Sequence, residues 1–315
     1  MLSSSKDKTL KLWSLSNGKN LATLPGHRGS PISCAWSPVD DSVVASCADN
    51  LELFIWDVNK SSIRLILEGH QRDDNPNFPV KDSLEGLKDL DYKSLIWSVC
   101  FSPDGKYLAS ACVDSDVILW DVISGAKIWT FNLPNDASTV AFAQTEHGTR
   151  LAAGSSAHHT VTLFDANFDD VSGKHTNGSS RTLALLGGHS DWVIDVAFNE
   201  DASRLASAAR DKTVRVWDAT AAENLREARF HAERCWSLVY SDDGKWLASA
   251  SDDFKVRNIG RGCFFDKSSH NLTSQSCCSF FPSFFFLETK DFIGFRLAPS
   301  FIEIRRKRKI RVIGL

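Results

Sequence analysis

A repeat with a period near 43 residues constrains this chain more than any other feature. An aromatic residue recurs at the end of each copy: Trp13, Trp56, Trp120, Phe164 and Trp217. Successive members of this series are 43, 64, 44 and 53 residues apart. Ten residues earlier each copy has a small residue: Ser3, Ser46, Ser110, Gly154 and Ser207. Six residues earlier each copy has a polar residue: Asp7, Asn50, Asp114, His158 and Asp211. A register held at several points indicates a repeat array, with insertions where the spacing is longer than 43.

One copy, residues 189–218, is complete and predicts the structure of the unit. It opens with His189 after Gly188 and closes with Trp217-Asp218. Between them lie the apolar runs WVIDVAF, RLASA and TVRVW, separated by polar residues typical of turns. Each run is too short for a helix and is rich in Val, Leu, Ala and Trp, so the unit predicts consecutive buried β-strands.

The Gly-His and Trp-Asp pairs at this spacing resemble the WD40-repeat family, whose members are β-propellers with four-stranded blades. The resemblance implies an all-β fold, and it implies a hydrogen-bonded tetrad of His, Ser, Asp and Trp inside each blade. In this chain one such tetrad would be His189, Ser207, Asp211 and Trp217. A second would be His70, Ser110, Asp114 and Trp120. The copy ending at Trp56 has Asn50 in place of Asp, and the copy ending at Phe164 lacks both the Gly-His pair and the Trp.

The repeats divide the chain into two parts. Residues 1–257 are expected to form an incomplete propeller of about four whole blades and a partial blade at each end, with loop insertions at 71–93 and 167–180. Residues 258–315 do not follow the repeat, and we expect an irregular or disordered tail there. Because the first copy begins in mid-repeat and the last stops where RNIG replaces RVWD, we expect the sequence to be a fragment with an aberrant end and unpaired sheet edges.

A function follows from the resemblance and agrees with a rigid frame that carries variable loops: a non-catalytic scaffold that binds other proteins or peptides. The loops expected on one face of the frame supply candidate contacts, which are Arg28, Asp191, Trp192, Arg210, Lys212 and Arg234. Two alternatives remain open at this stage. One is the sensor or regulatory part of a larger NTPase-type signalling protein, and the other is a nucleic-acid-associated adaptor that uses the basic run RRKRK at 305–309.

Several other functions are disfavoured by the sequence. Ser207, His189 and Asp211 have the residue types of a hydrolase triad, but the same trio recurs in other copies together with a Trp, which indicates a structural role. We expect no enzyme activity, cofactor, metal or small-molecule substrate, since no GxSxG, Walker A, HExxH or CxxC motif is present. Cys34, Cys47, Cys100, Cys112 and Cys235 are expected to be core residues. The net charge of −3 gives no argument for nucleic acid or a membrane surface, and we expect an intracellular protein, cytoplasmic or nuclear.

Overall fold

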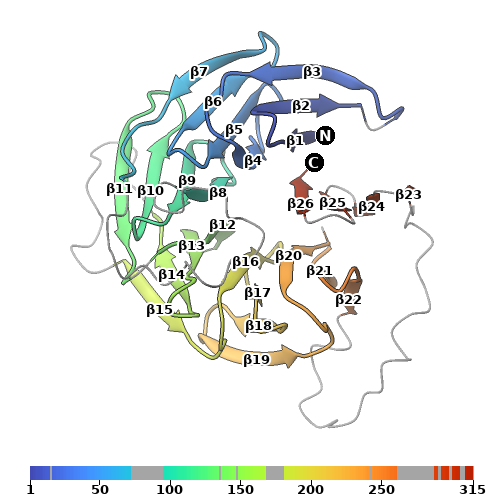
Figure 1. The fold of residues 1–315 in the computed structure, drawn as a ribbon. Coiled ribbons are helices and arrows are strands. Elements are labelled where there is room, and N and C mark those ends of the chain that lie inside the picture. Colours follow the sequence, from blue (N-terminus) through green and yellow to red (C-terminus); the bar gives the residue numbers. More distant parts are fainter. Residues whose placement is uncertain are drawn as a thin grey trace.

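In the computed structural model, the chain is a ring of antiparallel sheets arranged as propeller blades around a common centre (Figure 1). The structure describes residues 1–14, 16–71, 95–134, 136–146, 148–167, 181–241 and 243–260 together with their side chains, and the backbone of four strands within 287–314. In this part of the chain all regular structure is β, as the repeat predicts. No helix in the described part of the chain combines the length and apolar character needed to cross a bilayer.

Four complete blades have four strands each, and their innermost strand comes first in the sequence. The second blade contains β4 (Pro31–Trp36), β5 (Val43–Ala48), β6 (Leu53–Asp57) and β7 (Ser62–Ile66). The third contains β8 (Ile96–Phe101), β9 (Tyr107–Cys112), β10 (Asp116–Asp121) and β11 (Lys127–Asn132). The fourth contains β12 (Thr139–Thr145), β13 (Gly148–Gly154), β14 (Val161–Asp165) and β15 (Thr182–Leu186). The fifth contains β16 (Val193–Phe198), β17 (Arg204–Ala209), β18 (Val214–Asp218) and β19 (Glu223–Ala228).

The blades on either side of these four have three strands each, as expected for an incomplete propeller. The first contains β1 (Leu2–Ser4), β2 (Thr9–Trp13) and β3 (Asn20–Pro25), and it has no innermost strand. The sixth contains β20 (Cys235–Tyr240), β21 (Trp246–Ser251) and β22 (Val256–Gly260), and no described strand pairs with β22 on its outer side. No strand in the described residues joins these two sheets by backbone hydrogen bonds, so the ring is not closed by a shared blade.

The region after residue 260 differs from the irregular tail that the sequence predicts. The structure places four strands there, β23 (Leu287–Thr289), β24 (Phe292–Leu297), β25 (Ser300–Arg305) and β26 (Lys309–Gly314). They pair in sequence order, and this sheet lies in the gap between the first and sixth blades with β26 beside β1, β4 and β20 (Figure 1). The alternating stretches IEIR (302–305) and KIRV (309–312) are typical of strands, but they are short and do not follow the repeat, so the sequence alone does not assign them to a sheet.

The hydrophobic core lies between adjacent blades. One cluster joins Ile55 of the second blade to Ile118 and Trp120 of the third, and similar clusters lie between the later blades. The second strand of a blade is covered on both faces, and for this reason it consists largely of small residues, as in the fully buried β5 (VVASCA). The outer strands alternate between covered and exposed residues, as in β7 (SIRLI).

One backbone conformation recurs in the turn between the second and third strands of all six described blades. Each turn contains a residue with positive φ at the same place in the repeat: Lys8, Leu51, Ser115, His159, Lys212 and Phe254. Non-glycine residues rarely adopt this conformation, so its recurrence shows that the turn geometry is a fixed part of the unit. In the Gly-His pair, Gly188 has a φ of 141°, and a Cβ there would lie 2.7 Å from the Arg215 guanidinium. Glycine is therefore required before His189.

Candidate protein-interaction site at the channel mouth

The polar side chains at the repeated positions lie inside the blades. They link the segment that precedes each blade's first strand to the turn between its second and third strands. In the fifth blade the structure brings His189, Ser207, Asp211 and Trp217 together. Trp217 Nε1 donates to Ser207 Oγ at 2.8 Å, and His189 Nε2 lies 2.7 Å from the same oxygen. His189 Nδ1 lies 2.9 Å from Asp211 Oδ2. Since Ser207 accepts from Trp217, its own proton is directed to His189 Nε2, and His189 Nδ1–H then donates to Asp211.

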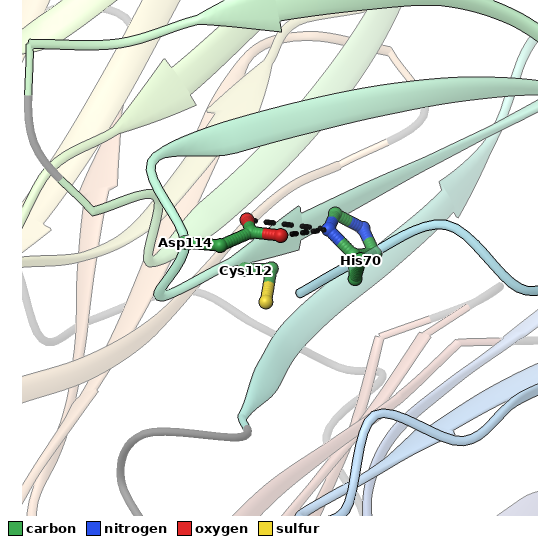
Figure 2. A group of neighbouring side chains, drawn as sticks. All are labelled: His70, Cys112 and Asp114. Carbon is green, nitrogen blue, oxygen red and sulfur yellow. Dashed lines mark hydrogen bonds and ion pairs between the residues drawn. The ribbon is translucent and has the colours of Figure 1, made fainter. Parts of the chain in front are cut away.

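The third blade has the same arrangement. His70 Nε2 lies 2.6 Å from Ser110 Oγ, and Trp120 Nε1 donates to the same oxygen at 2.8 Å. His70 Nδ1 lies 3.0 Å from Asp114 Oδ2, with Cys112 beside this pair (Figure 2). His70, Cys112 and Asp114 form a three-residue group of metal-ligand type, the one such group in the described residues. Both ring nitrogens of His70 are already used in hydrogen bonds to Ser110 and Asp114, so His70 and Asp114 belong to the tetrad.

The remaining blades show which functional residues the sequence reasoning missed. In the second blade Glu52, two residues after the expected position Asn50, takes the place of Asp: it lies 3.1 Å from His27 Nδ1 and accepts from the Arg28 N–H at 2.8 Å. In the sixth blade His231 contacts Ser249 and Asp253 at 2.8 and 3.0 Å, and Ile259 stands where Trp is expected.

The fourth blade has no His in the tetrad and uses a carboxylate from the opposite connection. Asp136, which precedes β12, accepts hydrogen bonds from the hydroxyl of Ser156 and from the Ala157 N–H, both in the turn between β13 and β14. Asp136 and Ser156 are each only 2% exposed. The sequence does contain a signal for Asp136, which is its position in the repeat. Asp136 precedes Gly154 by 18 residues, and His189 precedes Ser207 by the same number.

The pKa of each of these carboxylates reflects a balance between burial, which raises it, and hydrogen bonds from neighbouring donors, which lower it. Burial acts to raise the pKa of Asp211, but hydrogen bonds from His189 and Thr213 outweigh it, and that pKa lies well below its usual range. The pKa values of Asp114 and Asp253 are lowered in the same way. Asp136 has fewer donors, so burial dominates and its pKa is raised. Ser207 is fully buried between His189 and Trp217, and it is not presented to a substrate as a nucleophile would be.

A cavity of about 250 Å³ lies at the centre of the ring, at the end where the innermost strands begin. We call this cavity the channel mouth. Three of the six predicted contact residues, Trp192, Arg210 and Arg234, line this cavity. Arg210 lies over the Trp192 ring, 4.8 Å from its centroid, and 4.0 Å from Asp191. The other predicted residues lie outside the cavity lining: Asp191 beside Arg210, Lys212 beside Glu233 at 3.6 Å, and Arg28 on the second blade.

Trp97 and Trp236 also line the cavity, and the sequence reasoning missed both. The innermost strands β4, β8, β16 and β20 each shift register at the equivalent residue, which is Ile32, Trp97, Ile194 and Trp236 respectively. A β-bulge redirects a side chain out of the strand alternation, and all four side chains line the channel mouth. The signal in the sequence is that these residues occupy the same position in the runs PISCAW, IWSVCF, VIDVAF and CWSLVY.

Asp195 lies just below this bulge and links three neighbouring blades. Its carboxylate accepts from the N–H groups of Val196 and Leu238 at 2.9 and 2.8 Å, and from the hydroxyls of Ser237 and Thr139 at 3.0 and 3.4 Å. Burial raises the pKa of Asp195 to about 6 in spite of these donors. Its role in the described structure is therefore to join β12, β16 and β20 around the channel.

Together, the repeated blades, their internal tetrads and a solvent-connected channel define a propeller of the type built from sequence repeats. Comparison with known proteins identifies the repeat. The model of the WD40 family, "WD domain, G-beta repeat", matches residues 18–57, 88–121, 180–218 and 223–258, and this chain is a WD40-repeat protein.

Similar proteins contain the same repeats in longer chains. The Nuclear distribution protein PAC1 of Arthroderma benhamiae is 27% identical over 235 residues, which are 69% of this chain and 46% of the relative. The Transcriptional corepressor LEUNIG_HOMOLOG of Arabidopsis thaliana is 25% identical over 236 residues, 69% of this chain and 28% of the relative. Protein HIR1 of Cryptococcus neoformans is 27% identical over 183 residues, 52% of this chain and 20% of the relative. The chain spans less than half the length of each of these proteins.

Proposed function

We propose that this chain is a non-catalytic scaffold that binds a partner protein at the channel mouth, through the surface formed by Trp192, Arg210, Arg234 and Trp236. The observation that supports this function best is the cavity itself, because aromatic and Arg side chains gather there from separate blades on a rigid frame. Trp and Arg are the residue types most often responsible for affinity at protein interfaces.

The polar groups of the blades support a structural role and not a reaction. The Ser, His and Asp side chains are buried, occur in several blades, and are bonded to one another. We propose an intracellular place for the protein, cytoplasmic or nuclear, and unpaired thiols such as those of Cys47, Cys112 and Cys235 are typical of such reducing compartments. The basic run at 305–309, which would support a nucleic-acid adaptor, has side chains outside the described residues. Of the two predicted insertions, 71–93 and 167–180, residues 72–93 and 168–180 also lie outside them.

Affinity capture with paired variants tests the proposed function. Proteins captured from cells by the wild-type chain are compared with those captured by the double variant Trp192→Ala/Arg234→Ala. The matched control is Lys60→Ala, in the turn between β6 and β7 on the opposite rim, where the Lys60 side chain is 78% exposed. A partner retained by the control and lost by the double variant supports binding at the channel mouth, whereas capture unaffected by the double variant contradicts it.

A further inference from the structure

The channel mouth has a charge distribution that favours one class of ligand. Two guanidinium groups, those of Arg210 and Arg234, line the cavity, and their side chains are only 12% and 28% exposed. The carboxylates beside them belong to Asp191 and Asp252, whose side chains are each 42% exposed. These two guanidinium groups therefore lie deeper than the two carboxylates paired with them, and they favour an anion at this end of the cavity. A carboxylate in the lining itself, that of Asp195, is already held by four protein donors.

The ion pairs present at this site are weak enough for another anion to replace them. Arg210 Nε lies 4.0 Å from Asp191, and Arg234 Nε lies 3.5 Å from Asp252. The two carboxylates are partly exposed to solvent, which screens them, so ion pairs at such separations contribute little to stability. Burial lowers the pKa of Arg210, Arg234 adds to this effect, and Asp191 and Asp252 oppose it. Stacking on Trp192 fixes the plane of the Arg210 guanidinium, and a fixed guanidinium plane suits recognition of a planar carboxylate.

The buried carboxylate at the same site does not favour a cation. Each Asp195 oxygen already accepts hydrogen bonds from two protein donors, among them the backbone N–H groups of Val196 and Leu238. A lysine or arginine side chain entering the cavity would have to displace these donors while passing Arg210 and Arg234. Like charges on the approach oppose such entry.

The second part of the site is apolar. Ile32, Trp97, Ile194 and Trp236 surround the cavity from four blades at the level of the bulges. The indole N–H of Trp236 is buried and has no hydrogen-bond partner within the described residues. The cavity volume of about 250 Å³ suits one or two side chains and is too small for a folded element.

We propose that the channel mouth binds an exposed segment of a partner protein in which an acidic residue lies next to a large apolar residue. The carboxylate contacts Arg210 and Arg234, and the apolar side chain enters the ring of Ile32, Trp97, Ile194 and Trp236. This inference rests on the proposed function, since it names the chemistry of the partner at the same surface.

Short labelled peptides test this proposal with the full 315-residue chain. The probe is capped Gly-Ser-Glu-Leu-Ser-Gly, and binding is measured by fluorescence anisotropy at low and moderate salt. We expect affinity about tenfold higher than for the matched Gln-Leu peptide, because the Glu carboxylate is charged and the Gln amide is not; tenfold corresponds to about 1.4 kcal/mol. Replacing Leu by Ser in the peptide is expected to weaken binding by a similar factor. Equal binding of the Glu-Leu and Gln-Leu peptides, or tighter binding of a Lys-Leu peptide, would overturn the proposal.

Protein variants locate the site. Arg234→Gln is expected to weaken the Glu-Leu peptide about tenfold while leaving the Gln-Leu peptide unchanged, and Trp236→Leu is expected to weaken both. Lys212→Gln is the matched control, because it removes a positive charge from the same face but outside the cavity, and it should change affinity less than about twofold. A phosphoserine-Leu peptide that binds while Glu-Leu does not would also overturn the proposal, in favour of a phosphorylated ligand.

The two proposals fail in distinguishable ways. If partner capture depends on Trp192 and Arg234 but acidic-apolar peptides do not bind, the scaffold function stands and the ligand chemistry is wrong. If neither capture nor peptide binding responds to these residues, both proposals fail. Near-ultraviolet circular dichroism of each variant shows whether its fold is retained, and a variant that has lost its fold is replaced by Arg234→Lys, which keeps the charge but not the planar donor geometry.

Discussion

The fourth and fifth blades reach the same topology with opposite arrangements of one buried carboxylate. In the fifth blade Asp211 lies in the turn between β17 and β18 and accepts from His189 on the connection before β16. In the fourth blade the acid, Asp136, lies on the connection before β12, and the donors lie in the turn between β13 and β14. The comparison teaches that a blade needs a buried hydrogen bond between the segment before its first strand and the turn between its second and third strands. Either of these two segments can supply the carboxylate that accepts it.

The two links differ in strength because their donors differ. Asp211 is bonded to a His ring, a Thr hydroxyl and backbone N–H groups. Asp136 has one hydroxyl and one backbone N–H. The pKa of Asp211 is lowered and that of Asp136 is raised as a result. Ionised Asp211 is thus favoured by folding, whereas ionised Asp136 is disfavoured.

The largest expected effect is that of Asp211→Ala. The substitution leaves His189, Thr213 and the Ser190 N–H without their acceptor inside the protein, so we expect the free energy of unfolding to fall by about 3 kcal/mol. Denaturant titration followed by tryptophan fluorescence measures the change. Asp191→Ala, at a half-exposed carboxylate, is the control and should cost less than about 0.5 kcal/mol. An unchanged midpoint for Asp211→Ala would show that the link is dispensable in this blade.

Gly154→Ser tests whether the fourth blade could simply regain the tetrad serine. A Cβ at Gly154 would lie 2.7 Å from Thr139 Cγ2 of the same blade and 2.8 Å from Val193 Cγ1 of the fifth blade, so these two side chains leave no room for it. We expect a loss of about 2 kcal/mol from overpacking. A gain in stability, measured as a higher midpoint in the same titration, would mean that the blade lacks serine for another reason.

Trp217→Phe makes the fifth blade resemble the fourth, which has Phe164 at this position. The variant loses the hydrogen bond from Nε1 to Ser207, but Ser207 keeps its contact with His189. We expect a cost of about 1.5 kcal/mol from the lost bond and the reduced packing. Denaturant titration again measures the cost. A cost equal to that of Asp211→Ala would show that the fourth and fifth blades are less alike than we infer.

The smallest effect concerns pH, and its sign differs between the blades. The lowered pKa of Asp211 contributes stability above the ordinary value of 3.8, and this contribution is lost as pH falls below it. The raised pKa of Asp136 acts in the opposite sense: the folded protein binds the proton more tightly, so stability increases as pH falls toward 3.8 and decreases as pH rises through the folded-state pKa.

Asn variants separate these two contributions. In the wild type, acidification reduces the stability contributed by Asp211, and Asp211→Asn should abolish this reduction. Acidification increases the stability contributed by Asp136, and Asp136→Asn should abolish this increase. Each change is about 1.4 kcal/mol per unit of pKa shift. The measurement is the free energy of unfolding between pH 3 and 7, compared with the wild type. Subtracting the wild-type curve removes the contribution of Asp195, whose pKa is raised to about 6. Differences of the same sign for both variants would contradict the comparison.

The sequence predicts the fold well and the site only in part, for physical reasons. Spacing locates His189, Ser207, Asp211 and Trp217 because each strand and turn has a fixed length in the repeat. Glu52 and Asp136 are missed because a longer side chain or the opposite connection can bring an oxygen to the same place. Trp97 and Trp236 are missed because a bulge changes which face of the strand a residue occupies, and simple alternation does not show it. Lys212 and Arg28 are on exposed connections, and spacing does not show which of these face the cavity.

The bulges in β4, β8, β16 and β20 have a consequence for how such a protein changes over time. The bulged residue is the one that is skipped in the register with the neighbouring strand, and Ile32, Trp97, Ile194 and Trp236 each occupy that position. The side chain that lines the cavity is thereby separated from the residues that hold the blades together. New binding specificities can evolve by single replacements at the channel mouth, while the packing between the blades remains unchanged.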